Sequence, residues 1–266
     1  MVVQWILQRG HTDSERLGAV LEALGLQHSF ERMAPFIGDI DPVPQIDNPA
    51  NTIIFGLHST RNFARKHGLY PGIIELRPHI QEVAWQDFLL NPLKTTIFAT
   101  AAEIVSRLAD DPRDLFFVRA FDDTKALAGQ VLTKEQIEAT VAVTSILTKE
   151  EFFAESLNPT TELMVSSPVD IVAEWRLWIV DDKVATYSRY KQGDAVRWTY
   201  AIDDDVIPLA DSLIAKNPGY APAYVMDICR TDEGLKLLET NSINSAGLYK
   251  GNLTDLVQTL EEKFTS

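Results

Sequence analysis

The first 95 residues alternate between two hydrophobic periods. Short apolar runs at 2–8 and 51–56 are bounded by polar or glycine residues, which predicts β-strands. Between and after them, apolar residues recur at intervals of three and four, which predicts helices. These helices are expected over 14–25, 59–68 and 79–90. The alternation of strand and helix predicts an N-terminal α/β domain over residues 1–95.

The pattern changes in the second part of the chain. A helix is predicted over 101–109, and the apolar run at 114–121 is typical of a strand buried on both faces. Thr133 and Gln136 have the spacing of a capping box, which predicts the start of another helix. From residue 162 onward, short runs separated by turns predict antiparallel strands. They are expected at 162–167, 170–180, 183–191, 195–200, 224–230 and 235–241, with a helix over 206–219.

Composition indicates a globular protein with a sizeable core, since 45% of the 266 residues are hydrophobic. No apolar run reaches the ~18 residues of a membrane span, and the N-terminal segment lacks the charged region of a signal peptide. A single cysteine, Cys229, cannot form an internal disulfide and fits a reducing compartment. We therefore expect a cytosolic protein in which Cys229 is a core residue.

The formal net charge of −14 argues against nucleic acid or an anionic membrane as the main partner. A small anion is still possible, because a local cluster of cations can override the net field inside a cleft. Candidate chemistry therefore depends on where the few lysines and arginines come together. None of the five histidines has metal-site spacing with another.

One set of cations lies in the predicted hairpin over 170–191. With a two-residue loop at 181–182, counting places Arg176 opposite Tyr187 and Glu174 opposite Arg189. One face is then apolar, and the other carries four charged residues: Glu174, Arg176, Arg189 and Lys191. The alternative is a solvated face with a single cross-strand ion pair.

Two further cations precede this hairpin. Arg119 lies inside an apolar strand, where an unpaired charge is costly, so it must reach a carboxylate, an anionic ligand or solvent. Lys125 lies in a turn close to Gly129, where the backbone could approach a ligand. A structural salt bridge for Arg119 and simple solvation for Lys125 are the alternatives. Taken with the hairpin, these side chains are the kind that a polyphosphate requires.

The last hairpin brings carboxylates together. A three-residue loop at 232–234 would place Asp227 opposite Glu239 on one sheet face, with Asn241 two residues further on. Opposed like charges are destabilising, and a bound Mg²⁺ would remove the conflict by accepting oxygen ligands. The alternative is a shifted register with both acids in solvent. The following segment, 242–252, is rich in small polar residues and glycine, which suits contact with an anion or a reacting carbonyl, although a plain connecting loop is equally compatible.

Three blocks resemble, in order, the motifs of the ATP-grasp branch that is marked by one arginine and two lysines. They are FVRAFDDTKALAGQV, EWRLWIVDDKVATYSRYK and YVMDICRTDEGLKLLETNSINSAGLY, within residues 114–250. The N-terminal segment with NTIIFGLHSTRNFARKHGLYPGI is also similar to the leading α/β domain of that branch. The resemblance implies an α+β ATP-grasp fold, with two α+β lobes around a nucleotide cleft over residues 96–266, preceded by the α/β domain over 1–95.

The resemblance also implies roles for individual residues. Arg119 and Lys125 would contact the nucleotide or its phosphates, and Met164 and Val165 would occupy the hinge that meets adenine. Phosphate and transition-state contacts would come from Arg176 and Lys191, with Glu174 and Arg189 as further nucleotide contacts and Asn244 as a catalytic residue of the 242–252 loop. The implied Mg²⁺ ligands are Asp227, Glu239 and Asn241.

Members of this family mostly activate a carboxylate as an acyl phosphate, which an amine then attacks with formation of ADP and phosphate. The resemblance thus implies an ATP- and Mg²⁺-dependent carboxylate–amine ligase that acts on amino-acid, peptide or protein substrates. A phosphotransferase on the same scaffold is one alternative. A catalytically silent nucleotide-binding or interaction protein is the other.

Overall fold

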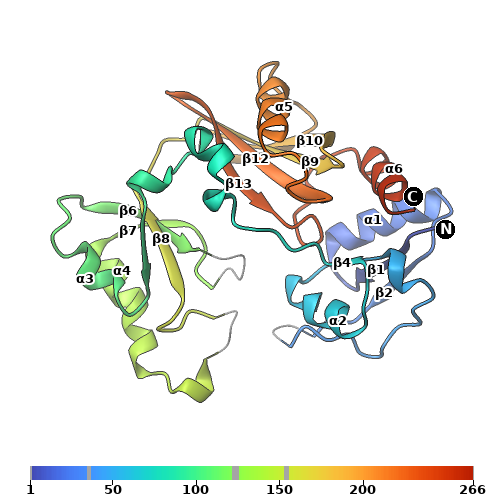
Figure 1. Ribbon diagram of the computed structural model, residues 1–266, viewed down its shortest axis with the longest axis horizontal. Coiled ribbons are helices and arrows are strands. Elements are labelled where there is room, and N and C mark those ends of the chain that lie inside the picture. Colours follow the sequence, from blue (N-terminus) through green and yellow to red (C-terminus); the bar gives the residue numbers. More distant parts are fainter. Residues whose placement is uncertain (1, 35–36, 122–125, 153–155, 266) are drawn as a thin grey trace. The chain divides into compact units, whose positions relative to one another are not determined.

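The computed structural model describes residues 2–34, 37–121, 126–152 and 156–265. Its contacts divide the chain into two compact units (Figure 1). Unit 1 combines Met1–Arg77 with Ile171–Ser266, and unit 2 is the continuous segment Pro78–Asp170. The domain boundary at residue 95 stays a prediction.

Unit 1 contains a parallel sheet with the strand order β2-β1-β3-β4. Its strands are β1 (Gln4–Gln8), β2 (His28–Glu31), β3 (Thr52–Phe55) and β4 (Pro71–Gly72), connected through α1 (Thr12–Ala23) and α2 (Arg61–Lys66). The helical spacing of α1 buries Leu17 and Leu21, as an amphipathic helix on a sheet requires. This confirms the predicted strand–helix alternation.

The predicted helix over 79–90 is wrong. The chain there forms short 3₁₀ turns, His79–Gln81 and Val83–Phe88. Ile80 and Trp85 are buried but five residues apart, while Val83 between them is 80% exposed, so the apolar positions do not form one helical stripe.

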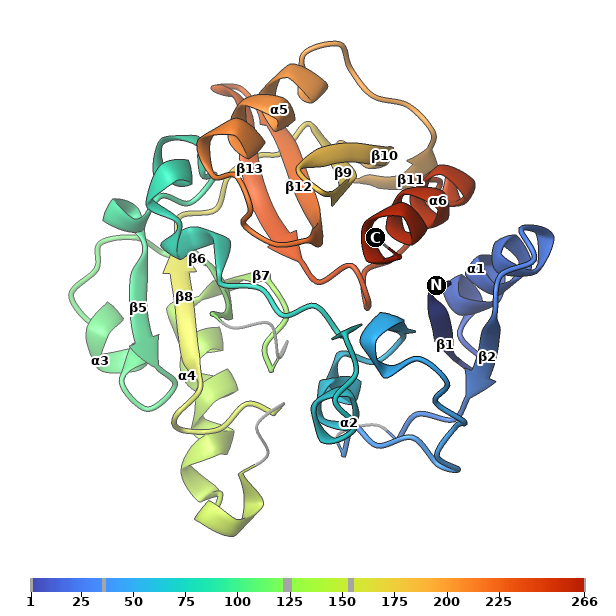
Figure 2. The same cartoon turned by 45° about the vertical axis from the view of Figure 1, so that its right-hand side comes forward.

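The second sheet of unit 1 is antiparallel and has five strands in the order β11-β10-β9-β12-β13. Its strands are β9 (Ala173–Val180), β10 (Lys183–Gln192), β11 (Ala195–Thr199), β12 (Ala223–Thr231) and β13 (Gly234–Asn241). The helix α5 (Val206–Lys216) packs against β10 and β12 (Figure 2). The helix α6 (Leu253–Phe264) packs against β9, β10 and α1, so the two ends of the chain lie side by side (Figure 1).

The register of β9 and β10 differs from the predicted one. The loop is at Asp181 and Asp182 as expected, and both residues have positive φ, which a two-residue hairpin turn with right-handed strand twist requires. Beyond it, register shifts occur between Val184 and Thr186 and again between Arg189 and Lys191. Each shift adds one residue to β10, as a β-bulge does, so simple counting from the turn fails.

Three pairings change as a result. Arg176 lies opposite Ser188 rather than Tyr187, and Glu174 lies opposite Lys191 rather than Arg189. Arg189 instead pairs with Trp175 and therefore belongs to the opposite face of the sheet. The prediction that Arg189 shares a face with Glu174 and Arg176 is wrong.

Unit 2 is built on an antiparallel sheet with the order β5-β8-β6-β7. Its strands are β5 (Ile97–Thr100), β6 (Leu115–Ala120), β7 (Gln130–Thr133) and β8 (Glu162–Ser166), and its helices are α3 (Ile104–Leu108) and α4 (Lys134–Ala142). The predicted capping box of Thr133 and Gln136 is present at the start of α4. The core contains Phe116, Val118, Ile137, Leu163 and Val165.

The strand β6 is not buried on both faces, contrary to the prediction from its dense apolar run. Phe116 and Val118 are fully buried, whereas Leu115 is half exposed and Phe117 and Arg119 are intermediate. Only the face toward α3 and α4 is covered by the core of unit 2, so burial alternates with the pleat.

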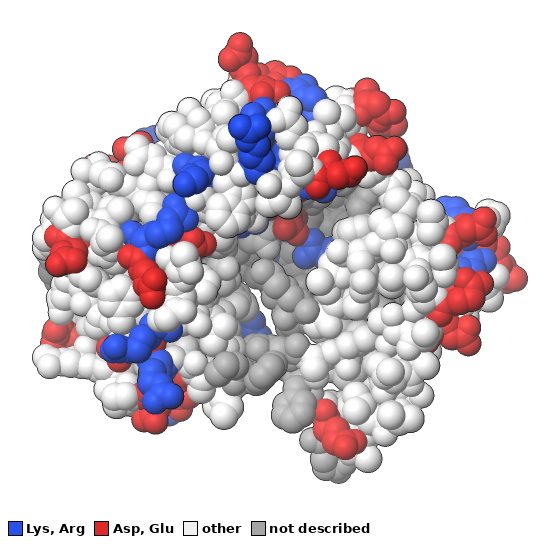
Figure 3. Space-filling view, turned by 180° about the vertical axis from the view of Figure 1, so that it is seen from behind, with Lys and Arg blue, Asp and Glu red and all other residues white. Residues whose placement is uncertain are grey.

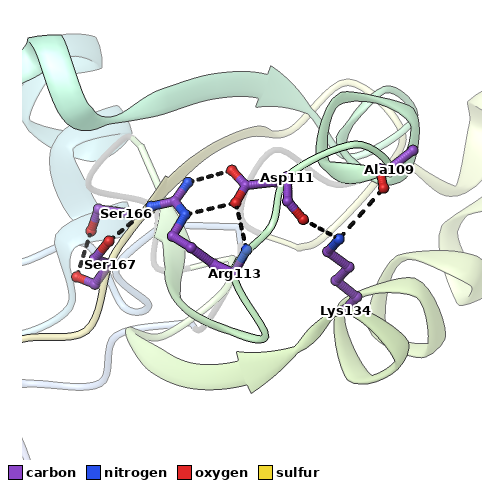
Figure 4. A network of polar contacts seen from close by, with 6 residues as sticks. All are labelled: Ala109, Asp111, Arg113, Lys134, Ser166 and Ser167. Atoms are coloured by element: carbon purple, nitrogen blue, oxygen red, sulfur yellow. Dashed lines mark hydrogen bonds and ion pairs between the residues drawn. The ribbon is translucent and has the colours of Figure 1, made fainter.

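A polar network joins the segments around this sheet (Figure 4). The guanidinium of Arg113 donates to both carboxylate oxygens of Asp111, from Nε at 2.9 Å and from Nη2 at 2.6 Å, and its Nη1 donates to the Ser167 hydroxyl at 2.9 Å. The ammonium of Lys134 donates to the carbonyl oxygen of Asp111 and, at 3.5 Å, to that of Ala109. The network connects the end of α3 to α4 and to the end of β8.

The surface mixes both signs of charge over the face shown in Figure 3. None of the helices in the described part of the chain combines the length and the apolar character that crossing a bilayer demands.

Candidate functional site

The strand registers of unit 1 gather charged residues on one face of the five-stranded sheet. Arg176 of β9 lies opposite Asp227 of β12, and Asp227 lies opposite Glu239 of β13. Because directly opposed residues point to the same side, these pairings define one face. We call it the charged face, and it carries Glu174, Arg176, Lys191, Asp227, Glu239 and Asn241.

A bidentate ion pair lies at the centre of the charged face. Arg176 donates from Nε to Oδ1 of Asp227 at 2.9 Å and from Nη2 to Oδ2 at 2.7 Å. The side chains are only 9% and 1% exposed. Burial raises the pKa of Asp227 to about 6, in opposition to the lowering by Arg176, and the nearby Glu239 raises it further. The carboxylate of Asp227 therefore depends on its cation to stay charged.

Two tyrosine rings cover the Arg176 guanidinium. Its Cζ lies 4.7 Å from the ring centroid of Tyr249 and 5.7 Å from that of Tyr190, and the two rings stack at 4.9 Å. Tyr249 has a φ of +40°, a region that bulky residues rarely occupy and that is frequent at functional sites. Trp198 of β11 lies against Tyr249 at 5.4 Å. These rings hold the guanidinium in one orientation.

Glu174 organises a second cluster beside this pair. Its Oε1 accepts a hydrogen bond from Lys191 Nζ at 2.9 Å, and its Oε2 accepts one from the Tyr190 hydroxyl at 2.5 Å. Glu174 is 7% exposed, whereas the Lys191 side chain is 33% exposed. The ammonium of Lys191 is thus anchored on one side and still reachable from solvent.

Asp227, Glu239 and Asn241 share the charged face, as predicted, but for a partly different reason. The hairpin has a two-residue loop at Asp232 and Glu233, and a bulge in β13 next to Ile228 restores the expected opposition of Asp227 and Glu239. Asn241 Nδ2 donates to Glu239 Oε1 at 2.9 Å, which leaves the amide oxygen as a possible ligand.

The chemistry of these three side chains fits Mg²⁺, which prefers oxygen ligands and binds through one or two carboxylates with waters and phosphates. Among the described residues no group of three or more His, Cys, Asp and Glu has the arrangement of a metal site. The set on the charged face contains two carboxylates and one amide. It therefore suits a metal that takes its remaining ligands from a bound phosphate.

Asn244 is completely buried and fully hydrogen-bonded. Its Nδ2 donates to the carbonyl oxygens of Ile54 at 2.8 Å and Gly72 at 3.0 Å, and its Oδ1 accepts from the Ile74 amide at 2.9 Å. These bonds fix the 242–252 loop to the parallel sheet of the same unit. The loop in turn presents the Gly247 carbonyl to Arg176 Nη1 at 3.3 Å.

Three of the predicted nucleotide contacts lie in unit 2. Arg119 of β6 pairs with Met164 of β8, so the two share a sheet face. Val165 is fully buried in the core of unit 2, with its side chain on the other face. Lys125 lies outside the described residues. The functional roles of all four stay predictions.

The aromatic residues of the site were not predicted from the sequence. Tyr190, Trp198 and Tyr249 come from β10, β11 and the 242–252 loop, which meet only in the folded chain. The bulge at Tyr190 turns its side chain toward Glu174, and a bulge leaves no mark in a hydrophobic pattern. The only usable signal was the closeness of Tyr249 to the small-residue segment that precedes it.

Residues 65–260 match the model of an ATP-grasp domain family, family 3 of the clade marked by one arginine and two lysines. The fold resembles that of a D-cycloserine synthetase, with a TM-score of 0.64, 14% identity and coverage of 98% of this chain and 99% of that chain. It also resembles a RimK domain ATP-grasp protein from Sphaerobacter thermophilus, with a TM-score of 0.60, 12% identity and coverage of 98% and 99%.

A third similar structure is D-alanyl-alanine synthetase A from Vibrio cholerae, with a TM-score of 0.58, 12% identity and coverage of 100% of this chain and 99% of that chain. No curated protein sequence matches the chain. At these low identities the structural matches establish the ATP-grasp fold.

Proposed function

Because this chain belongs to family 3 of the ATP-grasp clade that is marked by one arginine and two lysines, we propose that it is an ATP- and Mg²⁺-dependent ligase that joins a carboxylate to an amine. The observation that carries the proposal is the charged face. It combines an oriented guanidinium, an anchored ammonium and a set of oxygen ligands within one unit. A protein that only binds nucleotide has no need of all three.

Arg176 and Lys191 would bind the phosphates. The hydrogen bonds to Asp227 and Gly247 use three of the five N–H groups of Arg176, so two are available for phosphate oxygens. Lys191 adds a point charge that Glu174 holds in place. Catalysis of phosphoryl transfer depends mainly on such positioning and charge neutralisation.

Asp227, Glu239 and Asn241 would hold Mg²⁺ beside these cations. When bound, the metal would neutralise charge on the phosphates and orient them. The contacts of Asn244 suit a positioning residue, since its hydrogen bonds fix the loop that carries Gly247 and Tyr249. We propose that Arg119, Lys125 and Met164 contact the nucleotide from unit 2, and that Val165, whose side chain is buried in the core, does so through its backbone. Arg189 pairs with Trp175 on the opposite face of the sheet, so this position does not support the predicted nucleotide contact.

The reaction would proceed through an acyl phosphate. A carboxylate oxygen of the acid substrate would attack the γ-phosphorus of ATP, with cleavage of the bond to ADP. The nitrogen of the amine would then attack the acyl carbon and expel phosphate, with loss of a proton. The similar structures include a D-alanyl-alanine synthetase and a macrocyclase bound with a precursor peptide, which supports amino-acid or peptide substrates here. The single cysteine supports a cytosolic location, because it fits a reducing compartment.

The test is ADP release in the presence of Mg²⁺ and a panel of amino acids and peptides. We expect ADP and free phosphate in equal amounts, together with an amide product that mass spectrometry detects. Lys191→Met should lower the rate strongly, whereas Lys263→Met, which removes a surface ion pair with Asp181, should not. Retention of the phosphoryl group on the product would identify a phosphotransferase instead. Tight ATP binding without ADP release under any condition would identify a binding protein.

A further inference from the structure

The strand β11 exposes a row of large apolar side chains. Val196 is 70% exposed, Trp198 48% and Tyr200 53%. Val196 pairs with Lys191, and the alternation of side chains along a strand places Trp198 on the same side, which is that of the charged face. Tyr200 follows directly after the strand, but its ring stacks at 4.8 Å on Tyr187, which pairs with Leu177 on the other face, so the row on the charged face consists of Val196 and Trp198. Scattered apolar residues are ordinary at a surface, but a contiguous row marks an interaction site.

The same strand is an edge of the five-stranded sheet. Within the described ranges no strand pairs with the outer side of β11, and residues 192–198 are all exposed. An exposed edge presents unpaired backbone N–H and C=O groups, which template pairing with another extended chain. Main-chain hydrogen bonds and alternating side-chain contacts are the two components of peptide recognition by strand addition.

The row is continuous with the proposed reaction site. Trp198 contacts Tyr249, whose ring covers the Arg176 guanidinium at 4.7 Å. A chain that packs against Trp198 on the charged face would therefore lie next to the residues proposed to hold phosphate.

Charge and length specify the occupant. Residues 183–200 contain Lys183, Arg189, Lys191 and Arg197 against Asp194, and the Glu174 carboxylate neutralises Lys191, which leaves a net charge of +2 in a chain of −14. This local field favours an acidic partner. The two residue steps from Val196 to Trp198 span roughly 7 Å, which is the separation of alternate side chains in an extended peptide.

We propose that β11 is a docking strand for the peptide substrate. An extended acidic segment with apolar side chains at alternating positions adds to the outer edge of β11 and places those side chains against Val196 and Trp198. The assignment of this segment as a substrate rests on the proposed ligase function. Binding itself does not.

Tryptophan emission offers a direct test, because four of the five tryptophans are at most 1% exposed: Trp5, Trp85, Trp175 and Trp178. The probe is an acetylated and amidated heptapeptide that alternates glutamate with phenylalanine, used at micromolar concentration without ATP. Its binding should shift the emission to shorter wavelength and reduce quenching by acrylamide. Trp198→Phe should abolish both signals while the peptide still binds.

Affinity is measured separately, by fluorescence anisotropy of a labelled form of the same peptide. Trp198→Ala and Val196→Asp should each weaken binding by about tenfold or more, since a central apolar anchor contributes at least that much. Ile146→Asp changes an equally apolar residue of unit 2 that is 80% exposed and should leave the affinity unchanged.

Two N-methylated peptides test the pairing. Alternate amides of a strand point to opposite edges, so methylation of one alternate set should abolish binding and methylation of the other should not.

Three results would overturn the proposal. They are unchanged affinity in both Trp198→Ala and Val196→Asp, an equal response to the two methylated peptides, and equally strong binding of free phenylalanine. Normal ligation of free amino acids without any peptide binding would also overturn the docking proposal, but it would leave the proposed ligase function intact. Variant-sensitive peptide binding without ADP release would support the docking strand and refute the ligase function.

Discussion

The bidentate pairs Arg113–Asp111 in unit 2 and Arg176–Asp227 in unit 1 have nearly the same geometry, but the pKa values of their two carboxyl groups are shifted in opposite directions. Arg113 reaches Asp111 at 2.9 and 2.6 Å, and Arg176 reaches Asp227 at 2.9 and 2.7 Å. Hydrogen bonding from Arg113 lowers the pKa of Asp111 to about 2. Burial raises the pKa of Asp227 to about 6 despite an equally placed guanidinium. Contact geometry alone therefore does not determine the pKa of the carboxyl group.

Solvent access explains the difference. The side chains of Asp111 and Arg113 are 14% and 30% exposed, so water and the polar network of Figure 4 share the solvation of both charges. Those of Asp227 and Arg176 are 1% and 9% exposed, and the loss of hydration there can exceed the Coulombic attraction. A buried pair is weak evidence for stability by itself. The Arg176–Asp227 pair lies among the residues proposed to bind phosphate and metal, which indicates a role in function.

The largest expected difference between the two pairs is in the loss of stability when the arginine of each pair is replaced. We expect Arg176→Met to lower the free energy of unfolding by about 3–5 kcal/mol, because it leaves Asp227 buried without its cation. The matched change Arg113→Met should cost about 1 kcal/mol or less, since water can replace the lost contacts. Urea denaturation of both variants measures the two values. Equal losses would show that burial does not separate the pairs.

Replacement of Glu239, the carboxylate opposite Asp227, should lower activity without lowering stability. Glu239→Gln should lower the rate of ADP release by about a hundredfold, because it weakens a ligand of the proposed metal. Without Mg²⁺ the variant should melt at or above the parent temperature, since it relieves repulsion across β12 and β13.

Thermal melts with and without Mg²⁺-ATP, beside the ADP assay, check both parts. Mg²⁺-ATP should stabilise the parent more than the variant. Glu233→Gln, in the exposed loop of the same hairpin, is the control and should change neither quantity. Undiminished turnover and equal stabilisation of Glu239→Gln and the parent would show that Glu239 does not hold the metal.

The smallest effect concerns the pH dependence of the partly buried pair Arg113–Asp111. The pKa of Asp111 is lowered in the folded state, so its stabilisation is complete above the unfolded value of about 4 and decreases as the pH falls toward 2. Asp111→Asn should therefore cost about 0.5–1 kcal/mol at pH 6 and progressively less below pH 4. Urea denaturation between pH 6 and 3 measures this. A cost that is independent of pH would assign the effect to hydrogen bonds rather than to charge.

Much of the fold could be predicted from hydrophobic periods, because each strand and helix carries its own pattern. The ATP-grasp fold, the strand–helix alternation at the N-terminus and the antiparallel hairpins are all confirmed. The 3₁₀ turns at 79–88 were missed because Ile80, Val83, Ala84 and Phe88 recur at helical spacing, although Val83 and Ala84 are exposed.

The register of the site was less predictable. Bulges at Ala185, Tyr190 and Leu238 each insert a residue that no sequence pattern reveals. The opposition of Asp227 and Glu239 was predicted correctly only because a shorter loop and a bulge compensate.

The ion pair between Arg176 and Asp227 could not be predicted from the sequence for a different reason. It depends on β9 lying beside β12, and the order of strands in a sheet is a property of the whole fold rather than of either hairpin. The tyrosine rings over Arg176 come from two further segments, so they could not be predicted from local patterns either.

The division of unit 1 into two distant stretches of chain sets an order for folding on the ribosome. The strand β1 and its neighbours are complete when residue 77 has been added, but Trp5 donates to Glu261 and Asn244 donates to Ile54, and Glu261 and Asn244 are made later. At about 5–20 residues per second, the next 189 residues require roughly 10–40 s. Unit 2 is continuous and can fold within that interval. Segment 1–77 is therefore made before its partners in segment 171–266, and its sheet reaches those contacts only after α6 has emerged.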